Sequence, residues 1–255
     1  MIEKTRLNQT VSATVVIAVL IAATYVHDLL NAFSFYRELH GTRPWYLVES
    51  IDKLAVLILC CGILFVLHPH GWKGLISDLR LNASPLAAFG FAFTASIPMI
   101  LGFALTRKVG PDLNVPNLLF LALFSPFVEE VHVRGFGFWQ LRNLLKWPFW
   151  LAMLPQAALS GLGHIEKGAD LIQVLGIFLL IFAGAVVFSW LMDQWHSLWI
   201  PFFLHVLMNL WWEVFSVSNT VLGGWFPFAL QQLTVLLAIG ITLYLKRAGK
   251  LPVSR

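Results

Sequence analysis

The chain has 255 residues, of which 58% are hydrophobic and only 12% are charged, and soluble domains carry about 25% charged residues. This composition excludes a soluble domain with a single anchor and indicates a polytopic membrane protein. The apolar runs are long and continuous, which argues against a transmembrane β-barrel. The formal net charge of +4 comes from Lys and Arg scattered between these runs, as in topology-setting loops, so we expect no nucleic-acid partner.

The N-terminal part predicts one membrane span followed by a loop. Residues 11–25 form an apolar run with a short core, which fits either a transmembrane helix or a signal peptide. The cleavage site at Ala22-Ala23-Thr24 is weak and further spans follow, so an uncleaved helix is favoured. Residues 28–52 mix charged side chains with Trp45 and Tyr46, which predicts a loop with interfacial aromatic residues.

Two further spans are predicted before the middle of the chain, at residues 54–67 and 85–105. Between them, residues 72–81 place apolar side chains close to a helical period, which predicts a short helix lying in the membrane interface. Cys60 and Cys61 are adjacent within the second span. We interpret them as small buried residues that say little about the redox compartment.

The second half predicts five more spans, and the whole chain is therefore expected to form one all-α domain of about eight transmembrane helices. The fourth span begins near Pro116, and the others follow at residues 147–164, 171–192, 196–215 and 225–245.

An even number of spans places both termini on the same side of the membrane. The excess of Lys and Arg indicates that this side is the cytoplasm, and we expect an integral protein of a prokaryotic plasma membrane. The side of the termini receives eleven cations, which are Lys4, Arg6, Lys73, Arg80, Arg134, Arg142, Lys146, Lys246, Arg247, Lys250 and Arg255. The other side receives six, which are Arg37, Arg43, Lys53, Arg107, Lys108 and Lys167.

The fourth span carries two adjacent carboxylates, Glu129 and Glu130, with Arg134 four residues after the second. Ionisable groups inside a membrane segment are expensive, and they are candidates for function. Glu130 and Arg134 have the favourable spacing for a helical ion pair. Because neighbouring helical residues point about 100° apart, we expect that the two carboxylates do not face the same point equally.

The fourth and fifth spans predict a helical hairpin with its turn near Lys146. Glu129 lies 17 residues before this turn and His164 lies 18 after it, so antiparallel helices bring the two to nearly the same depth. This requires the fourth helix to continue to about Asn143, past two glycines.

The seventh span adds His205 and Asn209, which share a helical face near mid-depth. A carboxylate and an imidazole around one water form a general base, and a second imidazole with a carboxamide can stabilise an oxyanion. His132, three residues after Glu129, is expected to orient it. The simpler alternatives are an ion pair of the carboxylates with Arg134, an interfacial histidine at position 164, and hydrogen bonds between helices.

These residues resemble the intramembrane endopeptidases of the CAAX-protease and bacteriocin-processing (CPBP) family, which includes the type II CAAX prenyl endopeptidases. The first block is Glu-Glu-x-x-x-Arg at Glu129, Glu130 and Arg134, and the third is His-x-x-x-Asn at His205 and Asn209. The second, Phe-x-x-x-His, is matched only at its histidine, because its first position is Ser160. The three blocks lie in order within a core at about residues 80–215.

The resemblance implies an eight-helix intramembrane protease in which Glu129 and His164 activate water. His205 and Asn209 would stabilise the tetrahedral intermediate, and Glu130, Arg134 and His132 would support the site. The partners expected are a peptide or membrane-anchored protein substrate, prenylated or leader-bearing, and the lipid bilayer.

We expect no cofactor. Zn²⁺ is the alternative, and Glu129, His164 and His205 could bind it, but the His-Glu-x-x-His signature is absent. A metal-independent glutamate mechanism is therefore favoured.

Two other functions stay open at this point. A proton-coupled transporter could use the carboxylates as a relay, although no inverted repeat is visible. A non-catalytic membrane scaffold could retain the same bundle.

Overall fold

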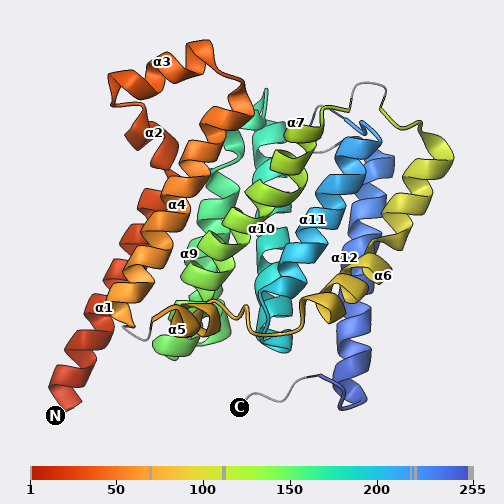
Figure 1. Ribbon diagram of the computed structural model, residues 1–255. Helices are drawn as coiled ribbons and strands as arrows, with labels where there is room; N and C mark the ends of the chain where they lie inside the picture. Colours follow the sequence, from red (N-terminus) through yellow and green to blue (C-terminus); the bar gives the residue numbers. More distant parts are fainter. Residues whose placement is uncertain (1, 69–70, 111–112, 219, 221–222, 252–255) are drawn as a thin grey trace.

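The computed structural model describes residues 2–68, 71–110, 113–218, 220 and 223–251, and the side chains from residue 9 onward except that of Lys167. All regular structure in these ranges is helical (Figure 1). The first half contains α1 (Ile2–Thr24), α2 (Val26–Leu30), α3 (Ser34–Thr42), α4 (Trp45–Leu67), α5 (Gly71–Asp78) and α6 (Pro85–Thr106). The second half contains α7 (Val115–Leu119), η1 (Phe120–Phe124), α8 (Ser125–Glu130), η2 (Val131–Phe138), η3 (Gln140–Leu144), α9 (Phe149–Leu162), η4 (Ile165–Lys167), α10 (Leu171–Trp195), α11 (Trp199–Val214) and α12 (Trp225–Arg247).

The protein is an all-helical membrane protein. Four helices in the described part are long and apolar enough to cross a bilayer, namely α4, α6, α10 and α12. Shorter apolar helices cover Gln9–Thr24 and Phe149–Leu162. The start of α1 and the end of α12 lie at the same end of the bundle, and α2 and α3 lie at the opposite end (Figure 1).

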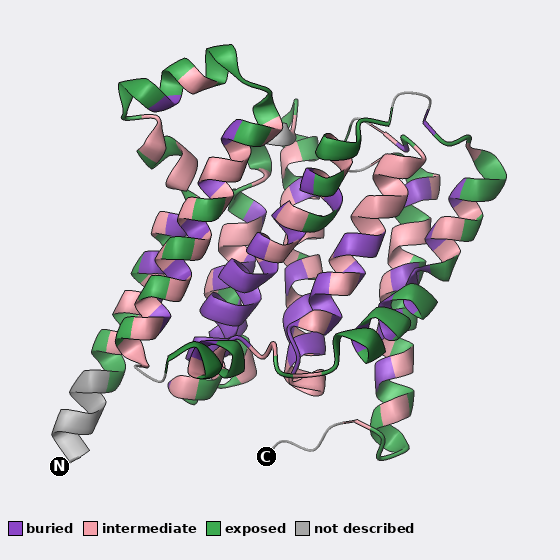
Figure 2. Cartoon of the chain, in the orientation of Figure 1, coloured by how far each residue is buried: buried purple, intermediate pink, exposed green. Residues whose placement is uncertain are grey.

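Many residues on the helices are exposed (Figure 2), and large apolar side chains are among them. Ile58 is 73% exposed, Leu105 84% and Ile172 82%. Large exposed apolar surfaces are rare on soluble monomers and mark contact with a partner or a membrane. Their presence along the long helices agrees with lipid contact.

The predicted loop at residues 28–52 is wrong, because these residues form α2, α3 and the first turns of α4. Pro44 precedes α4 with a φ of −55°, and such a fixed φ suits the start of a helix. The second span therefore begins at Trp45 rather than residue 54. Its first turns tolerate charge because Asp52, only 4% exposed, is hydrogen-bonded by two side chains described below.

The other predicted helices are present with small differences at their ends. The third, sixth and eighth spans correspond to α6, α10 and α12, and the short helix before the third span corresponds to α5. The fifth and seventh are shorter than predicted, as α9 and α11.

The fourth span is a continuous run of helical turns from α7 to the end of η3 at Leu144, which confirms the predicted continuation to about Asn143. Much of it is wound as π-helix, which the sequence did not predict. Such i→i+5 turns are rare and occur often at functional sites.

Two glycines in η2 allow neighbouring segments to approach this helix. A Cβ at Gly137 would lie 2.8 Å from Cδ1 of Leu20 in α1, and a Cβ at Gly135 would lie 2.9 Å from Cδ2 of Leu79. All eight residues of η2 are buried. The fourth span is therefore the central element of the bundle, and α8 holds the two glutamates within it.

Candidate functional site

The two adjacent glutamates lie on α8 in different environments. The Glu129 side chain is 32% exposed, whereas that of Glu130 is fully buried. Adjacent positions on a helix point about 100° apart, so one carboxylate faces an opening and the other faces the core. The prediction that they face different directions is confirmed.

The exposed carboxylate is held through one of its oxygens. Oε1 of Glu129 accepts hydrogen bonds from Nζ of Lys53, at 2.9 Å, and from Oγ of Ser125, at 2.7 Å. Oε2 lies 4.0 Å from Nε2 of His205. One oxygen is therefore occupied by two donors, and the other faces the imidazole.

The buried carboxylate is paired with an arginine and a histidine. Oε1 of Glu130 accepts hydrogen bonds from Nη1 of Arg134, at 3.1 Å, and from Nδ1 of His205, at 2.9 Å. The predicted helical ion pair between Glu130 and Arg134 is thus present. An ionised carboxylate only accepts hydrogen bonds, so His205 donates from Nδ1. In the neutral ring, Nε2 then carries the lone pair and faces Glu129.

One imidazole therefore connects the two carboxylates through its two nitrogens. As the helical wheel predicted, the two glutamate side chains point in different directions. His205 reaches both because Nδ1 and Nε2 lie on different edges of its ring.

The amide of Asn209 is hydrogen-bonded to the fourth span. Its Nδ2 donates to the carbonyl of Leu121 in η1, at 3.1 Å. A carboxamide nitrogen has two hydrogens, so one N–H is left for another acceptor after this bond. The contact also fixes α11 against the helix that carries the glutamates.

His164 follows the end of α9 and approaches the same site. Its Nδ1 lies 2.9 Å from the carbonyl of Ser160, to which it donates. His164 and His205 are both near enough to Glu129 to act on it electrostatically. The hairpin argument, which placed His164 at the depth of Glu129, agrees with this proximity.

His132 does not hydrogen-bond Glu129. It is buried, and its Nε2 lies 3.1 Å from the carbonyl of Leu20 in α1. The expectation that His132 orients Glu129 is therefore corrected. Its hydrogen bond to Leu20 attaches the first helix to η2.

The segment that carries this arrangement matches a known family. Residues 111–211 match the model described as type II CAAX prenyl endopeptidase Rce1-like. Over these residues the chain is similar to the type II CAAX prenyl endopeptidases, and we call residues 111–211 the CAAX-protease segment. The resemblance inferred from the three blocks is confirmed, and the family is one of CAAX-type intramembrane endopeptidases. No curated protein and no solved structure matches the chain.

Lys53 is the site residue that the sequence did not reveal. It lies on α4, outside the CAAX-protease segment, and its partner Glu129 is 76 residues away. We assigned it to an external loop, which is wrong because α4 begins at Trp45. The one available signal was a lysine directly before the apolar run of residues 54–67.

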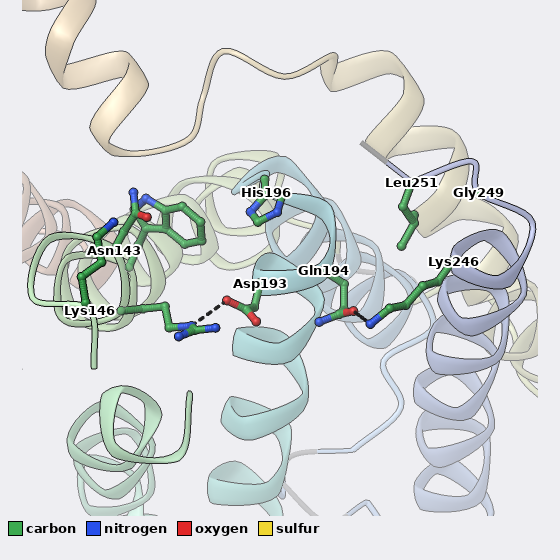
Figure 3. A pocket seen from close by; sticks show the side chains of 10 residues that line it. Asn143, Lys146, Asp193, Gln194, His196, Lys246, Gly249 and Leu251 are labelled. Carbon is green, nitrogen blue, oxygen red and sulfur yellow. Dashed lines mark hydrogen bonds and ion pairs between the residues drawn. The ribbon is translucent and has the colours of Figure 1, made fainter. Parts of the chain in front are cut away.

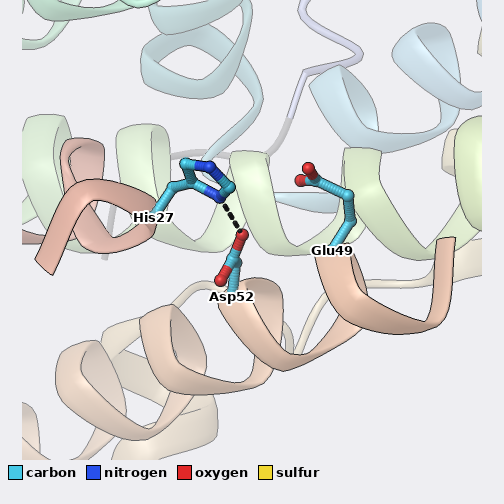
Figure 4. A group of neighbouring side chains, drawn as sticks. All are labelled: His27, Glu49 and Asp52. Atoms are coloured by element: carbon cyan, nitrogen blue, oxygen red, sulfur yellow. Dashed lines mark hydrogen bonds and ion pairs between the residues drawn. The ribbon is translucent and has the colours of Figure 1, made fainter. Parts of the chain in front are cut away.

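A second group of polar side chains lies at the end of the bundle that carries α2 and α3 (Figure 4). Ligand atoms of His27, Glu49 and Asp52 lie within 4.8 Å of one another, the spacing of a possible metal site. Oδ2 of Asp52 is 2.9 Å from Nδ1 of His27, and Oδ1 accepts a hydrogen bond from the Tyr36 hydroxyl at 2.5 Å. Both oxygens are thus engaged without an ion, and the network fixes α2 and α3 on α4.

The pKa of His27 reflects this network. Burial on its own would lower this pKa, but the hydrogen bond and charge of Asp52, with Glu49 and Asp28, outweigh burial and raise it. Burial and the bond to Asp52 also raise the pKa of the Tyr36 hydroxyl, so Tyr36 stays a donor.

Among the described side chains, this is the one group of three with metal-ligand spacing. Glu129, His164 and His205, the alternative zinc ligands, do not form such a group.

Two cavities lie away from the glutamates, one of them lined by residues at the end of α12 (Figure 3). One has a volume of about 600 Å³ and is lined in part by an Arg142–Asp193 ion pair of 3.0 Å and a Lys246–Gln194 hydrogen bond of 2.6 Å. A second, of about 280 Å³, adjoins it at Trp139. Neither is lined by Glu129, Glu130, His164 or His205.

Proposed function

We propose that the chain is an intramembrane endopeptidase that hydrolyses a peptide bond with a water molecule activated by Glu129 and His164. His205 and Asn209 would stabilise the oxyanion. The observation that carries this proposal is the imidazole of His205 between an accessible and a buried carboxylate, on helices of a CAAX-protease segment.

The separation between Glu129 and His205 suits one bridging water. Two polar atoms 4.0 Å apart can both contact a water at about 2.8 Å if it subtends about 90° between them. His164 would help to orient this water, and Oε2 of Glu129 would accept a proton from it as its oxygen attacks the carbonyl carbon. The same proton would then pass to the departing amine, so the carboxylate acts first as base and then as acid.

The buried carboxylate of Glu130, paired with Arg134, positions His205. Glu130 fixes the ring through Nδ1, as a carboxylate does for a histidine in other hydrolases. With a proton on each ring nitrogen, His205 would donate from Nε2, and Asn209 has one N–H beyond its bond to Leu121. These two donors would bind the oxygen that becomes negative in the tetrahedral intermediate.

The substrate class follows from the family description and the position of the site. A prenylated peptide with a C-terminal Cys-a-a-X sequence would be held by its lipid at the bilayer. A leader peptide or another membrane-anchored protein is the alternative. We propose eight membrane crossings, cytoplasmic termini and no metal ion in the reaction.

The test is cleavage of a farnesylated Cys-a-a-X peptide in proteoliposomes, followed by mass spectrometry of the released C-terminal fragment. Glu129→Gln should lower the rate about 10³-fold, and His164→Ala should lower it about 100-fold or more, because each removes a proton-transfer group. Lys73→Met, at an exposed residue of α5, is the control. A chelator should leave the wild-type rate unchanged, and undiminished cleavage by both site variants would refute the mechanism.

Comparing membrane proteomes of cells with wild-type protein and with Glu129→Gln would identify the natural substrate. We expect uncleaved C-termini or leaders only with the variant. Directional solute flux that needs Glu129, in proteoliposomes without cleavage, would instead support a transporter.

A further inference from the structure

We propose that Lys53 is a positioning residue of the active site, which fixes the Glu129 carboxylate so that one oxygen faces the attacked bond. This inference rests on the proposed function. It adds a group from α4 to a site whose other members lie within the CAAX-protease segment.

Each carboxylate of the site has its own cation from a different part of the bundle. Arg134, one turn after Glu130 on the same helix, pairs with Glu130 at 3.1 Å. Lys53, from α4, pairs with Glu129 at 2.9 Å. The Lys53 side chain is only 22% exposed, and a partly buried cation in a membrane segment is expensive unless it is paired. The ion pair with Glu129 therefore explains why a lysine is tolerated at this position of α4.

The contact determines which oxygen of Glu129 is available. The terminal torsion of a glutamate side chain has a broad energy minimum, so packing alone does not orient its carboxylate. Lys53 and Ser125 both donate to Oε1, which leaves Oε2 directed at His205. Ser125 lies one turn before Glu129 on the same helix, so it moves with Glu129. Lys53 fixes the carboxylate relative to a second helix.

This geometry favours a positioning role for Lys53 over a role in substrate binding, and the two roles predict different kinetic effects. Lys53 contacts Glu129 on the oxygen that does not face His205, so its removal should affect the chemical step. A misplacement of about 1 Å can cost about 100-fold in rate. Lys53→Met keeps the length of the side chain and removes its charge and donors. We expect kcat to fall about 100-fold with KM unchanged.

The experiment compares Lys53→Met, Lys53→Arg and Ser125→Ala in the peptide assay, with Lys73→Met as the control for loss of a lysine. Lys53→Arg keeps a charged donor and should recover most of the lost kcat. Ser125→Ala should cost less than Lys53→Met, since a neutral donor contributes less than a charged one. The double variant should lose less than the product of the two single losses, because both donors act on the same oxygen. Unchanged kcat in Lys53→Met, or a rise in KM alone, would overturn the inference.

A spectroscopic measurement keeps the inference testable independently of cleavage. The infrared carboxylate band that disappears in Glu129→Gln belongs to Glu129. This band should change position in Lys53→Met, because the ion pair is lost, and return toward the wild-type position in Lys53→Arg. A band that does not respond to Lys53 would overturn the inference. Absence of cleavage by the wild-type protein with a responsive band would instead refute the proposed function alone.

Discussion

Glu129 and Glu130 are neighbours with different expected effects on substitution, because their side chains differ in burial. Glu130 is fully buried and shares Oε1 between Arg134 and His205. Removing one partner of a buried ion pair leaves the other charge without compensation, which typically costs about 3–5 kcal/mol. Glu129 is 32% exposed, where the loss of a charge is partly compensated by solvent.

We therefore predict that Glu130→Gln lowers the melting temperature of the purified protein clearly more than Glu129→Gln does. Arg134, itself only 7% exposed, would lose its anionic partner. Thermal unfolding in one detergent, followed by tryptophan fluorescence, measures both variants. Equal melting temperatures would show that Arg134 has another source of compensation.

At the residue scale, spacing along the chain predicted most of the cluster but not its exact pairing. Glu130 with Arg134, and His205 with Asn209, stand four residues apart, an interval that places each pair on one helical face. Lys53 could not be found in this way, because its contact with Glu129 depends on where α4 begins and how it packs on α8.

At the scale of elements, the hydrophobic pattern predicted the length of the fourth span but not the way in which its helix is wound. Its length was predicted from the apolar sequence and the turn near Lys146. Its π-helical winding was not, because i→i+5 turns have no simple sequence period. The close approach of α1 at Gly137 also depends on packing between segments far apart in the sequence.

The α2–α3 segment provides an element-scale prediction of pH dependence. Its attachment to α4 includes the bond between His27 and Asp52. The other titratable groups nearby are Tyr36, Glu49 and Asp28, together with His40, whose ring meets that of His27 edge to face. The pKa of His27 is raised above its ordinary value of 6.5. Its contribution to the attachment is therefore fully present below pH 6.5 and is lost as the pH rises through the raised value.

We predict that α2 and α3 are better protected from hydrogen exchange at pH 6 than at pH 8, after correction for the intrinsic exchange rate. The effect should be small, because the His27 side chain is 42% exposed and solvent screens its interaction. His27→Gln should remove the pH dependence, and the backbone of α12 serves as the internal control. Protection that increases with pH would contradict this assignment.

At the scale of the whole molecule, the described structure leaves unchanged the excess of cations used to predict orientation. Lys53 and Arg134 are paired with glutamates inside the bundle, so neither counts as a loop cation. The eleven cations on the side of the termini then become ten, and the six on the other side become five. The excess stays at five, so cytoplasmic termini remain the prediction.

This orientation is testable with two single cysteines in a background without Cys60 and Cys61. Ser34 begins α3, and Lys250 follows α12 at the opposite end of the bundle; both are exposed (Figure 1). Ser34→Cys should react with an impermeant maleimide in intact cells, whereas Lys250→Cys should react only after the membrane is opened. Because eight crossings place α3 and the C-terminal end on opposite sides, labelling of both from the same side would refute the arrangement. The reverse pattern would keep the arrangement and refute the cytoplasmic termini.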